Sequence, residues 1–96
     1  MEIRYSKHFR ERMKLRGIDR ELAEDVFFHA DVHLEDTQTN TLVAVKRVII
    51  TGREKDIALI YKETDDEIPF ITIHPLREGQ VKSRIQSGRR KKHGRS

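Results

Sequence analysis

The spacing of histidine and arginine near the start of the chain could serve phosphodiester chemistry. His8, Arg12 and Arg16 follow one another at intervals of four residues. On a helix, residues four apart project from one side, so these three side chains would form a row. Arginine binds phosphate oxygens with two parallel hydrogen bonds, and histidine transfers protons near neutral pH. The alternative interpretation is a basic helix face that is simply solvated.

A second histidine, His74, stands directly before Pro75, with Arg77 three residues further on. We expect His74 at the end of a strand, where a scaffold can present a side chain to a cleft with Arg77 within reach. The alternative is an ordinary, half-exposed histidine.

Cations also interrupt the apolar segments of the second half. Lys46 and Arg47 lie inside an otherwise apolar run, and strand side chains alternate, so the two point to opposite faces of a sheet. At least one of them is then expected on the open face, and Tyr61 and Lys62 repeat the arrangement on the next strand. The alternative is an exposed sheet face whose charges oppose edge pairing.

Neither a metal nor a cofactor is expected. His29 and His33 have the spacing of a helical metal site, but His33 should lie past the helix end, and no third ligand is evident. The chain has no cysteine, which excludes disulfides, thiolate zinc sites and a Cys nucleophile. The acids at 65–67 are expected in a turn.

The net charge of +4 is a property of the tail. Residues 88–96 hold five of the 20 basic residues and no acid, which leaves 15 basic against 16 acidic residues, a net charge of −1, in the rest. There, basic and acidic blocks alternate. A fold that gathered the basic blocks would create a nucleic-acid footprint, whereas separate solvated faces are the alternative. The tail at 89–96 has no apolar residue, so we expect it to be disordered when free.

Two helices must position the first of these residues. Ser6 can cap a helix that runs to about Arg16, where Gly17 would end it. Asp19 can cap a second helix with almost no linker, so the two should form a helical hairpin. The buried stripe of the second helix is predicted at Leu22, Ala23, Val26, Phe27 and Ala30.

Segments rich in Val and Ile predict strands from residue 33 onward, separated by turn-like stretches. Pro75 should end the last long strand, because it cannot donate to the ladder. Strands are expected at 42–50, 57–62 and 68–74, and more weakly at 32–35 and 3–5.

The predicted fold class is α+β. We expect an N-terminal helical hairpin packed on a mainly antiparallel meander sheet of about three to five strands, with a short C-terminal helix at 78–87. Residues 1–88 would form this single domain and 89–96 the basic tail. Without a long apolar run or an apolar N-terminal region, we expect a cytoplasmic protein with no membrane span.

These features resemble a family of small bacterial and archaeal domains of unknown function, related to the RelE/ParE toxins and to BrnT-type toxins. The resemblance spans roughly residues 5–90 and implies a RelE-like sheet with helices on one face. In the better-known relatives it implies an endoribonuclease that cleaves mRNA and is neutralised by an antitoxin. ParE-like members act on DNA gyrase instead, so the fold does not fix the target. The matching segments are His8-x3-Arg12-Met13-x2-Arg16-Gly17-Ile18, the acidic second helix and Ile71-Thr72-Ile73-His74-Pro75.

Metal-independent RNA cleavage needs a base for the 2′-hydroxyl, an acid for the leaving 5′-oxygen and cations for the phosphate. Following the resemblance, we predict His8 and His74 as the proton-transfer pair, with Arg12 and Arg77 on the phosphate. No single carboxylate aligns with the catalytic Glu of some relatives. The residues predicted to bind nucleic acid are Arg16, Lys46, Arg47, Tyr61, Arg84, Arg89, Arg90, Lys91 and Lys92.

The predicted function is therefore a toxin-like, metal-independent endoribonuclease of the mRNA interferase type, from a toxin–antitoxin system. RNA or ribosome-bound mRNA would be its substrate, and an acidic antitoxin protein its partner. A non-catalytic RNA- or ribosome-binding module is the first alternative. The second is a gyrase-targeting inhibitor of the ParE type.

Overall fold

Two helices follow a short first strand in the structure, a computed structural model that describes residues 2–76 and 90–92. The first helix, α1 (Lys7–Arg16), begins at Ser6, whose hydroxyl accepts a hydrogen bond from the Phe9 N–H at 3.1 Å. It ends at Gly17, which adopts the left-handed conformation at φ 67° and donates its N–H to the Lys14 carbonyl. Both predicted caps are confirmed.

The second helix, α2 (Arg20–Phe28), begins as predicted at Asp19, whose carboxylate accepts from the Leu22 N–H at 2.8 Å. Its buried residues are Ala23, Val26 and Phe27. Ala30 lies beyond the helix end, so it packs against the core from the loop instead of extending the helical stripe. Neither helix in the described part of the chain has the length and apolar character that crossing a membrane requires.

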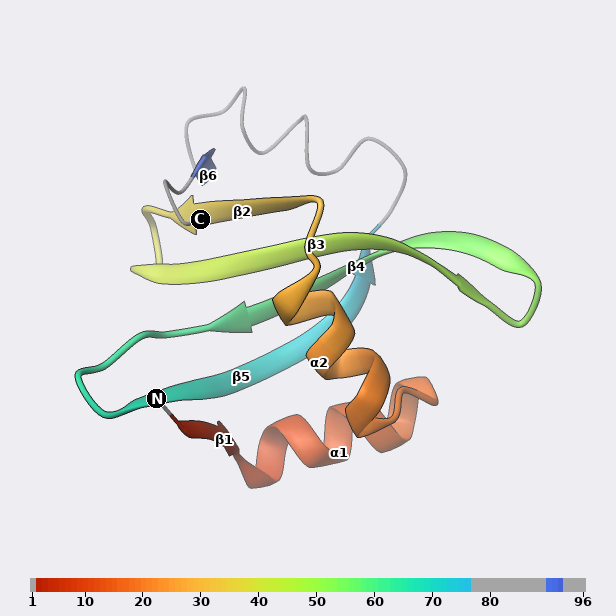
Figure 1. The fold of residues 1–96 in the computed structure, drawn as a ribbon, viewed down its shortest axis with the longest axis horizontal. Helices are drawn as coiled ribbons and strands as arrows, with labels where there is room; N and C mark the ends of the chain where they lie inside the picture. The colour runs from red at the N-terminus through yellow and green to blue at the C-terminus, as the bar shows by residue number, and fades with distance from the viewer. Residues whose placement is uncertain (1, 77–89, 93–96) are drawn as a thin grey trace.

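The strands form one mixed sheet in the order β1-β5-β4-β3-β2-β6 (Figure 1). The strands β2, β3, β4 and β5 pair antiparallel with one another in that order, β6 pairs antiparallel with β2, and β1 pairs parallel with β5. The strands are β1 (Glu2–Tyr5), β2 (Val32–Asp36), β3 (Thr41–Ile50), β4 (Arg53–Tyr61), β5 (Glu67–Leu76) and β6 (Arg90–Lys92).

This sheet corrects the predicted fold class. It has six strands and is mixed, whereas we expected a meander of about three to five mainly antiparallel strands. The difference arises because β1 precedes both helices and returns to the sheet beside β5, with Ile3 opposite Ile68, and such a parallel pair requires a long crossover. The C-terminal helix predicted at 78–87 lies outside the described residues.

Pro75 does not end β5 as predicted, because the strand continues to Leu76 with Pro75 opposite Ile57. Strand β1 pairs with β5 only as far as Phe70. Beyond Phe70, no described strand pairs with that edge of β5, so a proline there removes no ladder hydrogen bond on that side.

The core has a part on each face of the sheet. On the helix face, the ring centroids of Phe9 and Phe27 lie 5.3 and 5.2 Å from that of Phe70, and the same cluster contains the buried Tyr61. Strand alternation puts a second buried cluster, around Leu34 and Val43, on the other face. Burying each such side chain stabilises the fold by about 1.5–3 kcal/mol before entropy is counted. Helix α1 lies along β5 and α2 crosses the sheet beside it (Figure 1).

Candidate nucleic-acid interface

Helix α1 carries the largest unbalanced charge of the described residues. Half of its ten residues are Lys or Arg, and Glu11 is its single acid. Among the described residues, none of these five cations forms an ion pair. Four are exposed and Arg12 is half-buried. The five are Lys7, Arg10, Arg12, Lys14 and Arg16.

Helical geometry separates these cations into two rows, because successive residues are rotated by about 100°. Lys7, Arg10 and Lys14 form one row. His8, Arg12 and Arg16 form the other, and the structure brings the first two together, with Arg12 Nε donating to His8 Nε2 at 3.5 Å. This long hydrogen bond uses the Nε2 lone pair, so the neutral imidazole carries its proton on Nδ1.

The two cations of β3 are balanced by carboxylates, unlike those of α1. Lys46 faces α2, where its ammonium contacts the Asp25 carboxylate at 2.6 Å. Arg47 lies on the other face, as alternation predicts, and its guanidinium donates to the Asp56 carboxylate at 3.1 and 3.3 Å. Their roles in nucleic-acid binding stay predictions, but a neighbouring carboxylate compensates the positive charge of each.

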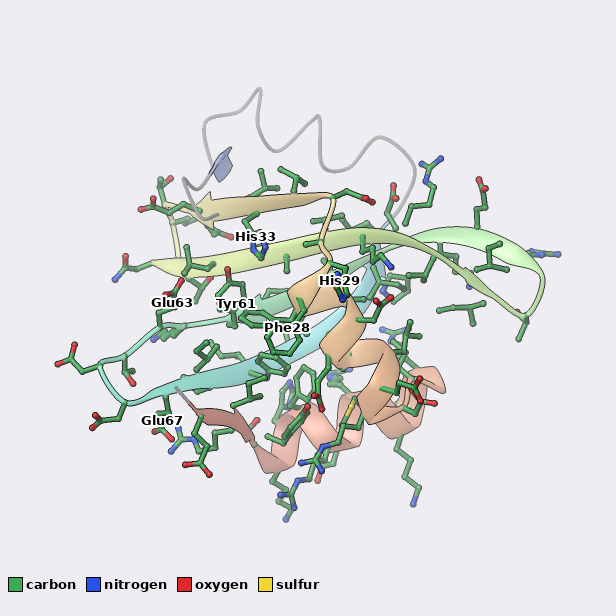
Figure 2. All side chains as sticks on the ribbon, viewed as in Figure 1. Phe28, His29, His33, Tyr61, Glu63 and Glu67 are labelled. Atoms are coloured by element: carbon green, nitrogen blue, oxygen red, sulfur yellow. The ribbon has the colours of Figure 1, made fainter. Side chains whose placement is uncertain are left out.

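Tyr61 lies in the core and not on an open sheet face, which corrects its predicted exposure. Its side chain is 0% exposed, and its hydroxyl lies 2.9 Å from His33 Nδ1 (Figure 2). Tyr61 follows Ile57 and Leu59 at two-residue spacing, so it shares their orientation toward the helices. A buried phenol on this face is not available to a nucleic acid.

A hollow at the end of β5 gathers three of the predicted site residues, Arg16, Arg47 and His74. His74 is half-buried, and its Nδ1 lies 3.2 Å from the Pro75 carbonyl oxygen. Lys55 and Asp56 from β4 also line the hollow, which is therefore mixed in charge.

His8 and His74 are not brought to one site. The Ser6 hydroxyl donates to the Phe70 carbonyl at 3.3 Å, so α1 begins beside Phe70. His74 lies four strand residues beyond Phe70, about 13 Å along β5. Alternation also puts His74 on the face opposite the helices. A proton-transfer pair must reach the same phosphodiester, which side chains on the helix side and on the opposite face of the sheet do not do.

The remaining predicted residues lie toward the C-terminus. Arg77, Arg84 and Arg89 are outside the described residues. The tail differs from expectation at Arg90–Lys92, which form β6, with Arg90 opposite Asp36 and Lys91 opposite Glu35. Acidic positions of β2 are thus in register with basic positions of β6.

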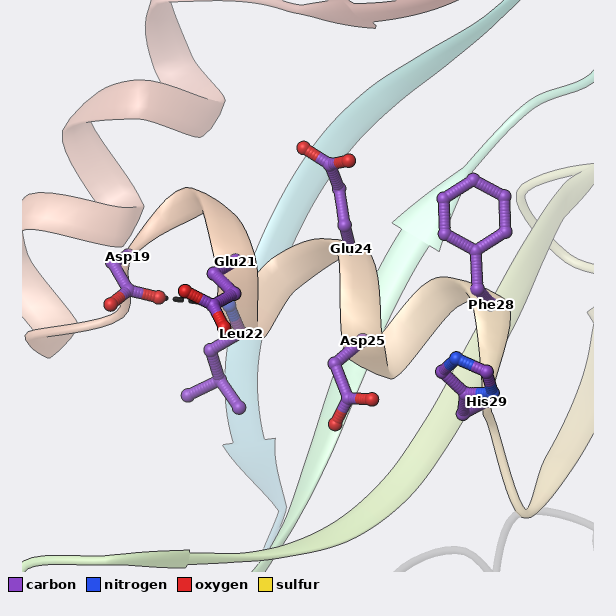
Figure 3. A pocket seen from close by; sticks show the side chains of 7 residues that line it. All are labelled: Asp19, Glu21, Leu22, Glu24, Asp25, Phe28 and His29. Carbon is purple, nitrogen blue, oxygen red and sulfur yellow. Dashed lines mark hydrogen bonds between the residues drawn. The ribbon is translucent and has the colours of Figure 1, made fainter.

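The outer surface of α2 is acidic and adjoins the basic α1. A hollow there is lined by seven residues, four of them acidic: Asp19, Glu21, Leu22, Glu24, Asp25, Phe28 and His29 (Figure 3). Negative charge at this position repels phosphate, which restricts a nucleic-acid interface to the α1 side.

His29 and His33, which have the spacing of a helical metal site, have different neighbours in the structure. The His33 imidazole lies beside the Tyr61 hydroxyl. His29 ends α2, and its backbone N–H donates to the Asp25 carbonyl. Among the residues described, no three His, Asp or Glu side chains are grouped as metal ligands.

Comparison with known proteins adds no relative. No protein family, no curated protein and no solved structure matches this chain. The likeness to RelE/ParE- and BrnT-type toxins therefore rests on the residues that suggested it.

Taken together, the described cations offer one surface for an anionic chain. The His8–Arg12–Arg16 row runs along α1 and ends beside Lys55, which sequence reasoning did not select. Lys55 lies in the basic block at 46–62, so block charge was the only signal for it. The block alone could not say which of its cations would have no ion pair among the described residues.

Proposed function

We propose that this protein binds RNA through its phosphate backbone, with α1 as the main contact surface. The supporting observation is that the five cations of α1 have no ion pair among the described residues, whereas Lys46 and Arg47 do. An unbalanced basic surface gains free energy when phosphates replace its counterions. The choice of RNA over DNA follows the resemblance to endoribonucleases, and the proposal includes a cytoplasmic location.

The row of His8, Arg12 and Arg16 is the part that would follow the backbone. Each four-residue step advances about 6 Å along the helix, so the three side chains are spread over about two turns. Each guanidinium can hold a phosphate with two hydrogen bonds.

The test is the salt dependence of RNA binding by Arg12→Gln/Arg16→Gln. Each phosphate contact of a single strand contributes about 0.7 to the slope of log K against log salt, so losing two should flatten it by about 1.4. Fluorescence anisotropy of a labelled oligoribonucleotide measures both affinity and slope.

Arg4→Gln is the matched control, because Arg4 is an exposed cation of β1 that already pairs with Glu67 at 3.4 Å. It removes the same charge per site but should leave the slope nearly unchanged. Equal losses of affinity per removed charge in Arg4→Gln and in Arg12→Gln/Arg16→Gln would show that net charge, and not α1, determines the binding.

Metal-independent RNA cleavage is the second candidate, and the contact between Arg12 and His8 favours it. When the Arg12 guanidinium moves from His8 Nε2 to the phosphate, the Nε2 lone pair that it releases could accept the 2′-hydroxyl proton. Incubation of RNA under EDTA separates the candidates. Fragments ending in 2′,3′-cyclic phosphate, lost in His8→Ala, support cleavage, whereas retarded but intact RNA supports binding alone.

An acidic antitoxin would cover the same cations, and a small acidic reading frame beside the gene would support that partner. Gyrase inhibition stays a prediction, with relaxed plasmid DNA in expressing cells as its sign.

A further inference from the structure

A small apolar groove lies between the end of α1 and the β3–β4 hairpin. Its deepest residues are Ile57, which is 0% exposed, and Ile18, which is 4% exposed. Ile50 and Pro75 are half-buried walls, and Leu15 forms a rim that is 69% exposed. An exposed leucine beside an open apolar groove leaves contiguous apolar surface for a ligand.

Two cations, Arg16 and Lys55, complete the groove. Both are exposed, and neither forms an ion pair among the described residues. Together with Pro75 they also line the neighbouring hollow that contains His74. The apolar groove therefore adjoins two cations at the end of the His8–Arg12–Arg16 row, although Glu54 and Asp56 also line the neighbouring hollow.

We infer that this groove receives one unpaired nucleobase of an RNA strand, with the flanking phosphate held by Arg16 and Lys55. The inference rests on the proposed function and specifies its substrate class as single-stranded RNA. Charge complementarity points to the ligand, since an apolar groove beside two cations that have no ion pair among the described residues matches a flat ring attached to a phosphate.

The size and chemistry of the groove agree with a single base. Its volume of about 250 Å³ is below the roughly 300–1,000 Å³ of pockets that take drug-sized ligands. Its apolar residues offer no side-chain hydrogen-bonding group, so discrimination among the four bases should be small. The Arg16 guanidinium can stack on the base, as arginine does on unstacked bases in RNA complexes. In a duplex the bases are paired and stacked, and the groove would stay empty.

The experiment compares single-stranded and duplex RNA of equal phosphate number at one salt concentration. The intact chain should bind the single strand about tenfold more tightly, a preference in the range of one stacked base. Leu15→Gln keeps the charge and a good helix former but removes the apolar rim. It should abolish most of this preference while leaving duplex affinity and the salt slope unchanged.

Ile49→Gln is the matched control, because Ile49 is a 72% exposed apolar residue of the same hairpin on the opposite face. It should change neither the affinity for single-stranded RNA nor the affinity for duplex RNA. A fluorescent base analogue in the single strand should change emission on binding to the parent and to Ile49→Gln, but not on binding to Leu15→Gln.

Equal binding of single strand and duplex by the parent would overturn the groove inference while the RNA-binding proposal stands. A preference that survives Leu15→Gln would overturn it as well. Absence of binding to either RNA would overturn the proposed function and this inference together.

Discussion

At the residue scale, Tyr5 shows how one side chain joins two elements. Its hydroxyl donates to the Glu24 carboxylate at 2.6 Å, and the Arg20 guanidinium lies 4.4 Å from its ring centroid. Burial, followed by the hydrogen bond to Glu24, raises the pKa of Tyr5 from 10.0 to about 12. The neutral phenol thus links β1 to α2.

Alkaline pH should weaken this link. Because the pKa is higher in the folded protein than in the unfolded chain, the stabilisation is complete below pH 10 and is lost as the pH rises to about 12. Urea unfolding of the parent and of Tyr5→Phe at pH 8 and pH 11 measures it. The variant should lose about 1 kcal/mol at pH 8 and show a smaller further loss at pH 11. Parallel pH profiles for the two proteins would contradict this assignment.

Individual charges were only partly predictable. The four-residue spacing of His8 and Arg12 was enough to predict that they meet, because helix geometry sets that distance. The ion pairs of Lys46 and Arg47 could not be predicted in this way, because their partners, Asp25 and Asp56, lie 21 and 9 residues away in the sequence.

At the scale of elements, the position of α1 depends more on contacts at its N-terminus than on burial along the helix. Phe9 is its one buried residue, so burial contributes little along the rest of the helix. Ser6 caps it and also donates its hydroxyl to the Phe70 carbonyl on β5. The cap therefore sets both where α1 begins and where it lies on the sheet.

Ser6→Ala should lower the free energy of unfolding by about 1 kcal/mol through loss of the cap. Ser6→Asp retains a capping acceptor and adds favourable charge at the helix start, but it cannot donate to Phe70. We expect Ser6→Asp to recover most of the loss in urea denaturation. If the two variants are equally destabilised, the hydroxyl's bond to β5 matters more than the cap.

At the scale of the whole molecule, the fold segregates charge. The basic α1 and the acidic outer surface of α2 are neighbours, yet the α1 cations have no carboxylate partner among the described residues. Basic blocks that are distant in sequence meet at Arg16 and Lys55. Fewer cations gather there than the charge blocks suggested, because Asp25 and Asp56 of neighbouring elements form ion pairs with Lys46 and Arg47.

The basic strand β6 tests whether the tail adds to this surface. Substituting Arg90, Lys91 and Lys92 by Gln in the full chain keeps the strand's backbone but removes three cations. If each contacts a phosphate, RNA binding should weaken and its salt slope should flatten by up to about 2. A variant that keeps the parent's affinity and slope would show that these three cations do not contact the RNA.

The sequence by itself determined the local features of this protein. Caps at Ser6 and Asp19, the left-handed Gly17 and the cation row on α1 follow from hydrogen bonds and sterics within a few residues, which the sequence states directly. Tertiary structure alone decided the parallel place of β1, the burial of Tyr61, the separation of His8 from His74 and the groove beside Arg16. Each of these depends on which distant segments pack together, and that is settled by burial and charge compensation over the whole chain, which no short pattern contains.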